Sequence, residues 1–190
     1  MDAMSVIVIV GTAVLALALG WGVVRAYNRL IRLRNQTQAS WAQIDVQLKR
    51  RHDLIPNLVE TVTEYADHER GTFEAVTAAR GAAASGGLGT AQRAQAEGQL
   101  TATLAKLLAT AEAYPQLKAD RNFLRLQSEL TGAEDRIAYA RQFYNAAVQS
   151  YNTALETFPS NLVAGLASHA PKEYFEAEAA TREAVQVSFR

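Results

Sequence analysis

The sequence predicts an all-α protein: an N-terminal transmembrane helix followed by a long antiparallel, up-and-down bundle of three long helices and a short C-terminal helix. Three observations support this fold class. The 190 residues include only 11 Gly and 4 Pro, the residues that most often interrupt helices. The apolar residues recur at alternating spacings of three and four, which is the period of a packed helix. One N-terminal run carries no charge for long enough to cross a bilayer.

The N-terminal run, residues 6–24, is the predicted membrane span. As a helix it is about 28 Å long, close to the roughly 30 Å hydrocarbon core of a bilayer. Residues 1–5 contain no Lys or Arg, which argues against a cleaved signal peptide. The cationic residues that follow the span predict a short external tail at 1–5 and a bundle in the cytoplasm. They are Arg25, Arg29, Arg32 and Arg34.

The first long helix of the bundle is expected over residues 27–80, with residues 25–40 as a juxtamembrane stalk. Its apolar positions keep the alternating spacing over the whole range. They include Leu30, Trp41, Ile44, Leu48, Ile55, Leu58, Val62 and Val76. Pro56 lies within this helix and removes one backbone hydrogen bond, to the carbonyl of His52. Because the apolar seam continues in register on both sides, a kink is expected there and not an end.

The rest of the chain divides at its Gly and Pro residues. The run G-A-A-A-S-G-G-L-G at 81–89 predicts a flexible linker, and Thr90 is the expected cap of a helix over 90–113. Tyr114-Pro115 ends this helix, because the residue before a proline is pushed out of helical geometry. A long helix over 117–158 follows, with a seam of aromatic residues and alanines.

Phe158-Pro159 predicts a loop, and Pro171 is a suitable first residue for a last short helix over 171–184. The bundle is therefore expected over residues 41–185, with a C-terminal tail at 186–190.

Composition excludes several classes of function. A formal net charge of zero, from 19 basic and 19 acidic residues, provides no field to attract nucleic acid, so none is expected as a partner. The absence of cysteine excludes disulfides, zinc–thiolate sites and thiol catalysis. The run G-G-L-G-T at 86–90 is neither a phosphate-binding loop nor a dinucleotide fingerprint, and no cofactor is expected.

Charged residues at 45–69 are the only dense group with potential chemistry. Asp45 and His52 are two helical turns apart, about 10 Å, which is too far for a direct hydrogen bond. Glu64 and His68 are four residues apart, a spacing typical of surface pairs, and no further ligand shares their register. No catalytic residue and no metal ligand is therefore assigned. A metal-binding or hydrolytic protein that uses the charged residues of 45–69 remains the alternative class.

Arg51 is anomalous because it occupies an apolar seam position. A buried guanidinium without a partner is strongly destabilising, so Arg51 should pair or reach solvent, and Glu134 is one candidate partner. The alternative is that Arg51 belongs to an exposed interaction patch. That patch comprises Lys49, Arg50, Arg51, Asp53, Pro56 and Asn57.

Several runs of this sequence resemble the bacterial LemA family. The most specific is W-A-Q-I-D-V-Q-L-K-R-R-H-D-L-I-P-N-L-V-E-T-V at 41–62. Others are Y-N-R-L-I-R-L-R-N at 27–35, H-E at 68–69, E-A-Y-P-Q-L-K-A at 112–119, N-F-L-R-L-Q-S-E-L at 122–130, R-I-A-Y-A-R-Q-F-Y-N at 136–145 and Y-N-T-A-L-E-T-F-P-S-N at 151–161. His52 departs from the family pattern, which has an aromatic or similar residue there, and this weakens a catalytic role for His52.

The resemblance implies a single-pass protein of the bacterial inner membrane, with its N-terminus outside and its helical bundle inside. It brings no catalytic residues or cofactor. Some members of the family act in magnetosome membrane formation, which adds membrane organisation to the implied roles.

We therefore expect a membrane-anchored scaffold or adaptor without enzymatic activity. The expected partners are the lipid bilayer and a membrane or cytoplasmic protein. A homo-oligomer is also among them, because coiled-coil-like seams close equally well between chains. A transmembrane signalling module is the third reading, and the short external tail at 1–5 leaves it little to sense with.

Overall fold

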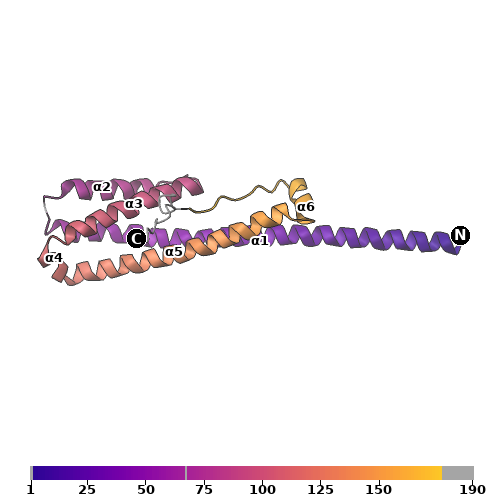
Figure 1. Cartoon of the computed structure of the whole chain (residues 1–190), viewed down its shortest axis with the longest axis horizontal. Helices are drawn as coiled ribbons and strands as arrows, with labels where there is room; N and C mark the ends of the chain where they lie inside the picture. Colours follow the sequence, from indigo (N-terminus) through magenta and orange to yellow (C-terminus); the bar gives the residue numbers. More distant parts are fainter. Residues whose placement is uncertain (1, 67, 177–190) are drawn as a thin grey trace, which may run out of the picture. The chain divides into compact units, whose positions relative to one another are not determined.

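The computed structural model describes residues 2–66 and 68–176 of the chain (Figure 1). Every regular element in this part is a helix, which confirms the predicted all-α class. The elements are α1 (Ala3–Thr63), α2 (Arg70–Ala83), α3 (Thr90–Ala111), α4 (Pro115–Ala119), α5 (Arg121–Glu156) and α6 (Ser160–Leu166).

The chain divides into two compact units, and α1 and α5 contribute to both. The unit that contains the span predicted at 6–24, which we call the membrane-proximal unit, comprises, among the described residues, 2–41 and 143–172. The distal unit contains 42–142 and 173–176.

The core of the distal unit is a continuous apolar cluster drawn from five helices. It is built on the seam that the sequence predicts, so alternating three- and four-residue spacings place one face of each helix inside. Its fully buried members include Ile55, Leu58 and Val62 of α1, Val76 of α2, Leu100 and Leu107 of α3, and Leu117 of α4. Phe123, Leu126 and Leu130 of α5 complete it.

The prediction of one helix over 27–80 is wrong. Helix α1 ends at Thr63, and α2 begins at Arg70 and runs back beside α1 and α3 (Figure 1). Ala66 and Phe73, on the two sides of the turn, are buried in the same core. The apolar spacing continues through the turn, so periodicity alone carries no mark of the reversal.

Most other helix ends lie near their predicted places. Within the linker predicted at 81–89, residues 84–89 are not helical, whereas residues 81–83 belong to α2. Helix α3 begins at Thr90, which is its first helical residue and not its cap. The cap is Gly89, whose N–H donates to Gln92 Oε1 over 3.1 Å. Helix α1 continues through Pro56, as predicted.

The predicted helix over 117–158 is two helices, because Asp120 separates α4 from α5. Asp120 has extended backbone geometry, and its Oδ1 accepts a hydrogen bond from the Phe123 N–H over 2.9 Å. A carboxylate in this position satisfies one of the free N–H groups at a helix start. Asp120 therefore ends one helix and caps the next.

The membrane-proximal unit pairs the first half of α1 with the end of α5 and with α6. Its core joins Ala26 and Leu30 of α1 to Ala154 of α5 and to Val163 and Ala164 of α6. Residues 25–40, the predicted stalk, thus include buried side chains. Helix α6 occupies part of the stretch that the sequence predicts to be a loop.

The predicted C-terminal helix over 171–184 is wrong for residues 171–176, which are not helical; residues 177–184 lie outside the described part. The Asn152 side-chain amide explains the difference. Its Oδ1 accepts from the Lys172 N–H, and its Nδ2 donates to the Lys172 carbonyl, both over 2.9 Å. Because these backbone groups are satisfied by α5, the segment has no need of helical hydrogen bonds.

Within the described residues, one helix has the length and hydropathy of a membrane span. It is α1, and none of its most apolar 18-residue window is buried inside the protein. An unburied apolar window differs from the core helix of a soluble protein, which is covered by its own chain. This finding agrees with the span predicted at 6–24.

Candidate functional site

The centre of the distal unit holds a buried ion cluster around Arg51. This side chain of α1 is only 2% exposed. Its guanidinium pairs with Glu97 of α3 and with Glu134 of α5, and it donates to Thr101 Oγ1 over 2.8 Å. The predicted pairing of Arg51 with Glu134 is confirmed. The cluster joins three helices, because one planar guanidinium can meet two carboxylates in fixed directions.

Glu97 is the member of the cluster that sequence reasoning missed. Its side chain is 6% exposed, whereas that of Glu134 is 39% exposed. The second carboxylate oxygen of Glu97, Oε1, lies 3.0 Å from His52 Nε2. The sequence does contain a sign of this burial. Glu97 lies three residues before Leu100 and seven before Leu104, on the apolar seam of α3. Two charged residues on the seams of neighbouring helices indicate a buried pair.

A second polar contact in this region compensates for Pro56. Proline has no N–H, so the carbonyl of His52, four residues earlier, loses its helical donor. Arg80 of α2 supplies a replacement, donating from Nε to His52 O over 2.8 Å. Since a side chain of α2 replaces the lost backbone donor, packing of α2 stabilises α1 where it passes through Pro56.

A cleft of about 370 Å³ lies beside this cluster, and charged groups from α1, α2 and α3 line it. Arg93 of α3 pairs with Asp45 of α1 at 2.6 Å, and Lys49 pairs with Asp53 at 3.2 Å. The second pair is highly exposed, so it contributes little to stability. The first links two helices across the cleft.

The structure separates the six residues of the predicted interaction patch. Lys49, Arg50, Asp53, Pro56 and Asn57 are exposed on α1, whereas Arg51 is buried beneath them. We call the five exposed residues the α1 stripe. Arg51 acts inside the protein, where its pairs fix α1 against α3 and α5, and the α1 stripe is what a partner can reach.

The residues considered for catalysis or metal binding are not brought together. Asp45 contacts Arg93, His52 contacts Glu97, and His68 is exposed beyond the end of α1. Within residues 2–66 and 68–176, no group of three or more His, Asp or Glu side chains is placed to hold a metal ion. Asp45 and His52 are thus each placed beside an oppositely charged or potentially charged side chain of α3.

One tyrosine near the turn between α1 and α2 is electrostatically perturbed. The Asp120 carboxylate raises the pKa of Tyr65 above its usual value, with smaller contributions from burial and from Glu64. The Tyr65 hydroxyl lies 3.5 Å from Asp120 Oδ2. This contact ties the end of α1 to the residue that caps α5.

Comparisons with known proteins give a consistent result. The chain is 28% identical over 175 residues to magnetosome protein MamQ 2 of Paramagnetospirillum magneticum, covering 79% of this chain and 64% of the relative. It is 27% identical over 175 residues to magnetosome protein MamQ of Magnetospirillum gryphiswaldense, with 78% and 64% covered. It is 26% identical over 137 residues to protein LemA of Metamycoplasma hominis, with 72% and 63% covered. The chain thus spans less than two thirds of the length of these relatives.

The profile described as LemA family matches residues 40–189. This range contains the whole ion cluster, the α1 stripe and the end of the described structure. The chain belongs to the LemA family.

Proposed function

We propose that this protein is a membrane-anchored helical scaffold, which presents the α1 stripe to a partner close to the cytoplasmic face of the bacterial inner membrane. The observation that carries the proposal is the continuity of α1. A single helix of 61 residues contains both the apolar, unburied window and the α1 stripe. A partner bound at the stripe is therefore connected to the membrane through one continuous helix.

The ion cluster supports an interaction role over a catalytic one. Its charges pair with each other, and Arg51 also donates to the Glu97 carbonyl, which fixes α1 against α3 and α5. The α1 stripe is the opposite: an exposed row of two cations, one anion, a proline and an asparagine. A rigid surface of mixed charge favours specific contact with a protein partner.

The named relatives support membrane organisation as the process. Two of them are named as magnetosome proteins. We infer that this chain works at a membrane as well, with its N-terminus outside and its bundle in the cytoplasm, following the arginines after the span.

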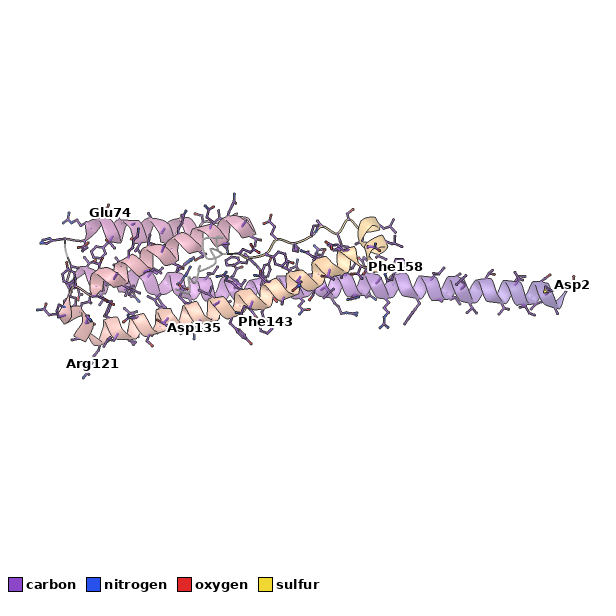
Figure 2. The ribbon with its side chains drawn as sticks, viewed as in Figure 1. Asp2, Glu74, Arg121, Asp135, Phe143 and Phe158 are labelled. Atoms are coloured by element: carbon purple, nitrogen blue, oxygen red, sulfur yellow. The ribbon has the colours of Figure 1, made fainter. Side chains whose placement is uncertain are left out.

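Site-specific photocrosslinking in cells tests the scaffold. Crosslinking residues are placed at Lys49, Asp53 and Glu60, which are exposed on one side of α1. The matched control is Glu74, an exposed residue on the outer side of α2 (Figure 2).

The proposal predicts that the three α1 positions capture the same protein, that Glu74 does not, and that Arg50→Glu abolishes the capture. Capture of a second copy of this chain would identify a homo-oligomer as the partner. Equal capture from Glu74 and from α1 would contradict a specific surface.

Topology is tested separately. The chain contains no cysteine, so Ser5→Cys and Glu60→Cys each provide a single labelling site. A maleimide that cannot cross the inner membrane should label position 5 in intact cells and position 60 only after lysis. The reverse pattern would overturn the proposed orientation.

A further inference from the structure

The membrane-proximal unit carries a feature that the scaffold does not use: the segment Phe158–Lys172, folded against α1 just beyond the span. Val163 and Ala164 of α6 are packed on Ala26 and Leu30. With the span ending at residue 24, these two α1 residues lie about 3 and 9 Å beyond the hydrocarbon edge along the helix. The headgroup layer is about 5–7 Å thick on each side. Core packing thus holds α6 beside a part of α1 that runs from the headgroup layer to just beyond it.

The outer side of this segment is apolar and exposed. Leu162 and Leu166, four residues apart on α6, are 61% and 88% exposed, and Phe158, in the turn before α6, is 75% exposed. Figure 2 shows Phe158 at the end of α5, where α6 begins. In water such side chains are unfavourably placed. Exposed apolar side chains along one helix are typical of helices that lie in a membrane interface.

Behind α6 lies a polar pocket of about 290 Å³ between α1, α5 and the residues after α6. Arg34 and Lys172 bring two cations to its wall, together with His169, Ser168 and Tyr27; no Asp or Glu is among its described lining residues. Helical side chains lean toward the N-terminus of their helix, so Arg34 leans toward the membrane. A pocket with cations and no carboxylate selects an anion.

Two further observations show that the pocket has a defined shape. Ser168 has a φ of 51° and follows the C-cap of α6, where the His169 N–H donates to the Ala164 carbonyl over 3.1 Å and so fixes the turn that forms one wall of the pocket. Tyr151 is buried and its hydroxyl lies 3.0 Å from His169 Nδ1. Burial raises the pKa of Tyr151, and the Arg34 guanidinium partly offsets this rise. Arg34 and Tyr151 both line the pocket.

We propose that the segment Phe158–Lys172 binds an anionic phospholipid. Phe158, Leu162 and Leu166 enter the boundary of the acyl chains, and the lipid phosphate is held by Arg34 and Lys172. This inference rests on the membrane anchor of the proposed function and adds a second, lipid-selective contact to it.

The depth of α6 in the bilayer is the first test. Single cysteines at Leu162 and Leu166 carry a nitroxide in the full chain, reconstituted in vesicles of phosphatidylcholine and phosphatidylglycerol. Accessibility to oxygen and to a water-soluble nickel complex gives the depth of each label. Leu15→Cys in the span and Gln38→Cys, about 21 Å beyond it, are the controls.

Labels at 162 and 166 should lie between these controls, at the acyl boundary. If both are as accessible to nickel as the label at 38, the lipid contact is refuted and the anchor stands. If the label at 15 is also in water, the anchor itself fails.

The selectivity of the pocket is the second test. Native mass spectrometry of the full chain counts bound phosphatidylglycerol and phosphatidylcholine. The double variant Arg34→Gln, Lys172→Gln should lose about tenfold or more of its preference for phosphatidylglycerol, since each cation near an anionic surface contributes substantially to binding.

The control is Arg29→Gln, Arg32→Gln, which removes the same charge from exposed residues outside the pocket. Equal losses in both double variants would show a general basic surface and overturn the pocket. Displacement of bound lipid by millimolar inorganic phosphate would show a site for free phosphate and overturn the lipid assignment.

Discussion

At the scale of single residues, Arg51 determines how the bundle is held together. It occupies a seam position that an apolar residue would fill, and it connects α1 to Glu97 and Glu134. Two carboxylates around one buried cation are stable only while the cation is present. The cluster therefore specifies which helices are neighbours more than it adds to net stability.

Replacing Arg51 tests this view. Arg51→Met leaves Glu97 buried without its cation, and we expect the free energy of unfolding to fall by about 3–5 kcal/mol. The neighbouring exposed residue provides the control, since Arg50→Met should change it by less than about 0.5 kcal/mol. Denaturation of the full chain in detergent micelles, followed by circular dichroism, measures both. Equal losses of unfolding free energy in Arg50→Met and Arg51→Met would show that burial of the Arg51–Glu97 pair has no energetic consequence.

A double-mutant cycle on Arg51 and Glu134 gives the strength of the individual pair. Contacting charged residues commonly show coupling energies of about 0.5–3 kcal/mol. Because Glu134 is 39% exposed, solvent weakens this pair, and we expect a value in the lower half of that range. A coupling energy of zero would show that Glu97 alone holds Arg51.

Pro56 and Arg80 form a second residue-scale unit. Arg80→Met leaves the His52 carbonyl without its donor, which should lower the free energy of unfolding by about 1–3 kcal/mol. Pro56→Ala restores a backbone N–H that can bond to the same carbonyl. Arg80→Met should therefore be less damaging in the Pro56→Ala background than in the parent. Equal losses of unfolding free energy in the two backgrounds would show that Arg80 stabilises the protein through a contact other than the His52 carbonyl.

At the scale of elements, the ends of the helices are determined by individual polar contacts. Asp120 is the clearest case, because one side chain separates two helices, caps α5 and lies beside Tyr65 at the end of α1. The carboxylate charge and the capping oxygen are separable properties of this residue. Asparagine retains the oxygen and removes the charge.

Asp120→Asn should leave α5 in place and lower the pKa of Tyr65 toward its ordinary value near 10. In the parent, the raised pKa means that the folded state holds the phenolic proton more tightly than the unfolded state. The corresponding stability is present below pH 10 and is lost as the pH rises above it. NMR titration of labelled tyrosines, with Tyr65→Phe for assignment, measures the shift. An unchanged pKa would exclude the Asp120 carboxylate as its main cause.

At the scale of the whole molecule, α1 links an apolar segment to a folded bundle. The segment has no covering partner within the described residues, and the LemA-family relatives include magnetosome proteins. Together these features indicate a membrane protein.

Charged residues introduced into the span test whether α1 anchors the protein in a membrane. An arginine at the centre of a membrane helix costs about 2.5–3.5 kcal/mol in insertion experiments. Leu15→Arg combined with Leu17→Arg should therefore move the protein from the carbonate-resistant membrane fraction to the soluble fraction. Gln38→Arg adds a cation outside the span and should leave the distribution unchanged. Retention of the double variant in the membrane would show that another part of the chain anchors it.

Local patterns in the sequence are sufficient for the helical class, for a candidate membrane span and for the seam residues of the core. These follow from local rules: helix propensity, a three- and four-residue apolar period, and the length of an uncharged run. The sequence also indicated Arg51 as a buried residue in need of a carboxylate, because a charge on an apolar seam is conspicuous without any coordinates.

Only the tertiary structure decided where the chain reverses and which groups meet. The spacing of Val62, Ala66, Phe73 and Val76 is the same for a continuous helix and for two helices joined by a turn, so periodicity could not reveal the turn. The bonds from Arg80 to the His52 carbonyl and from Asn152 to Lys172 join residues 28 and 20 positions apart. Such contacts depend on how elements pack, and packing is a property of the folded chain that no local pattern records.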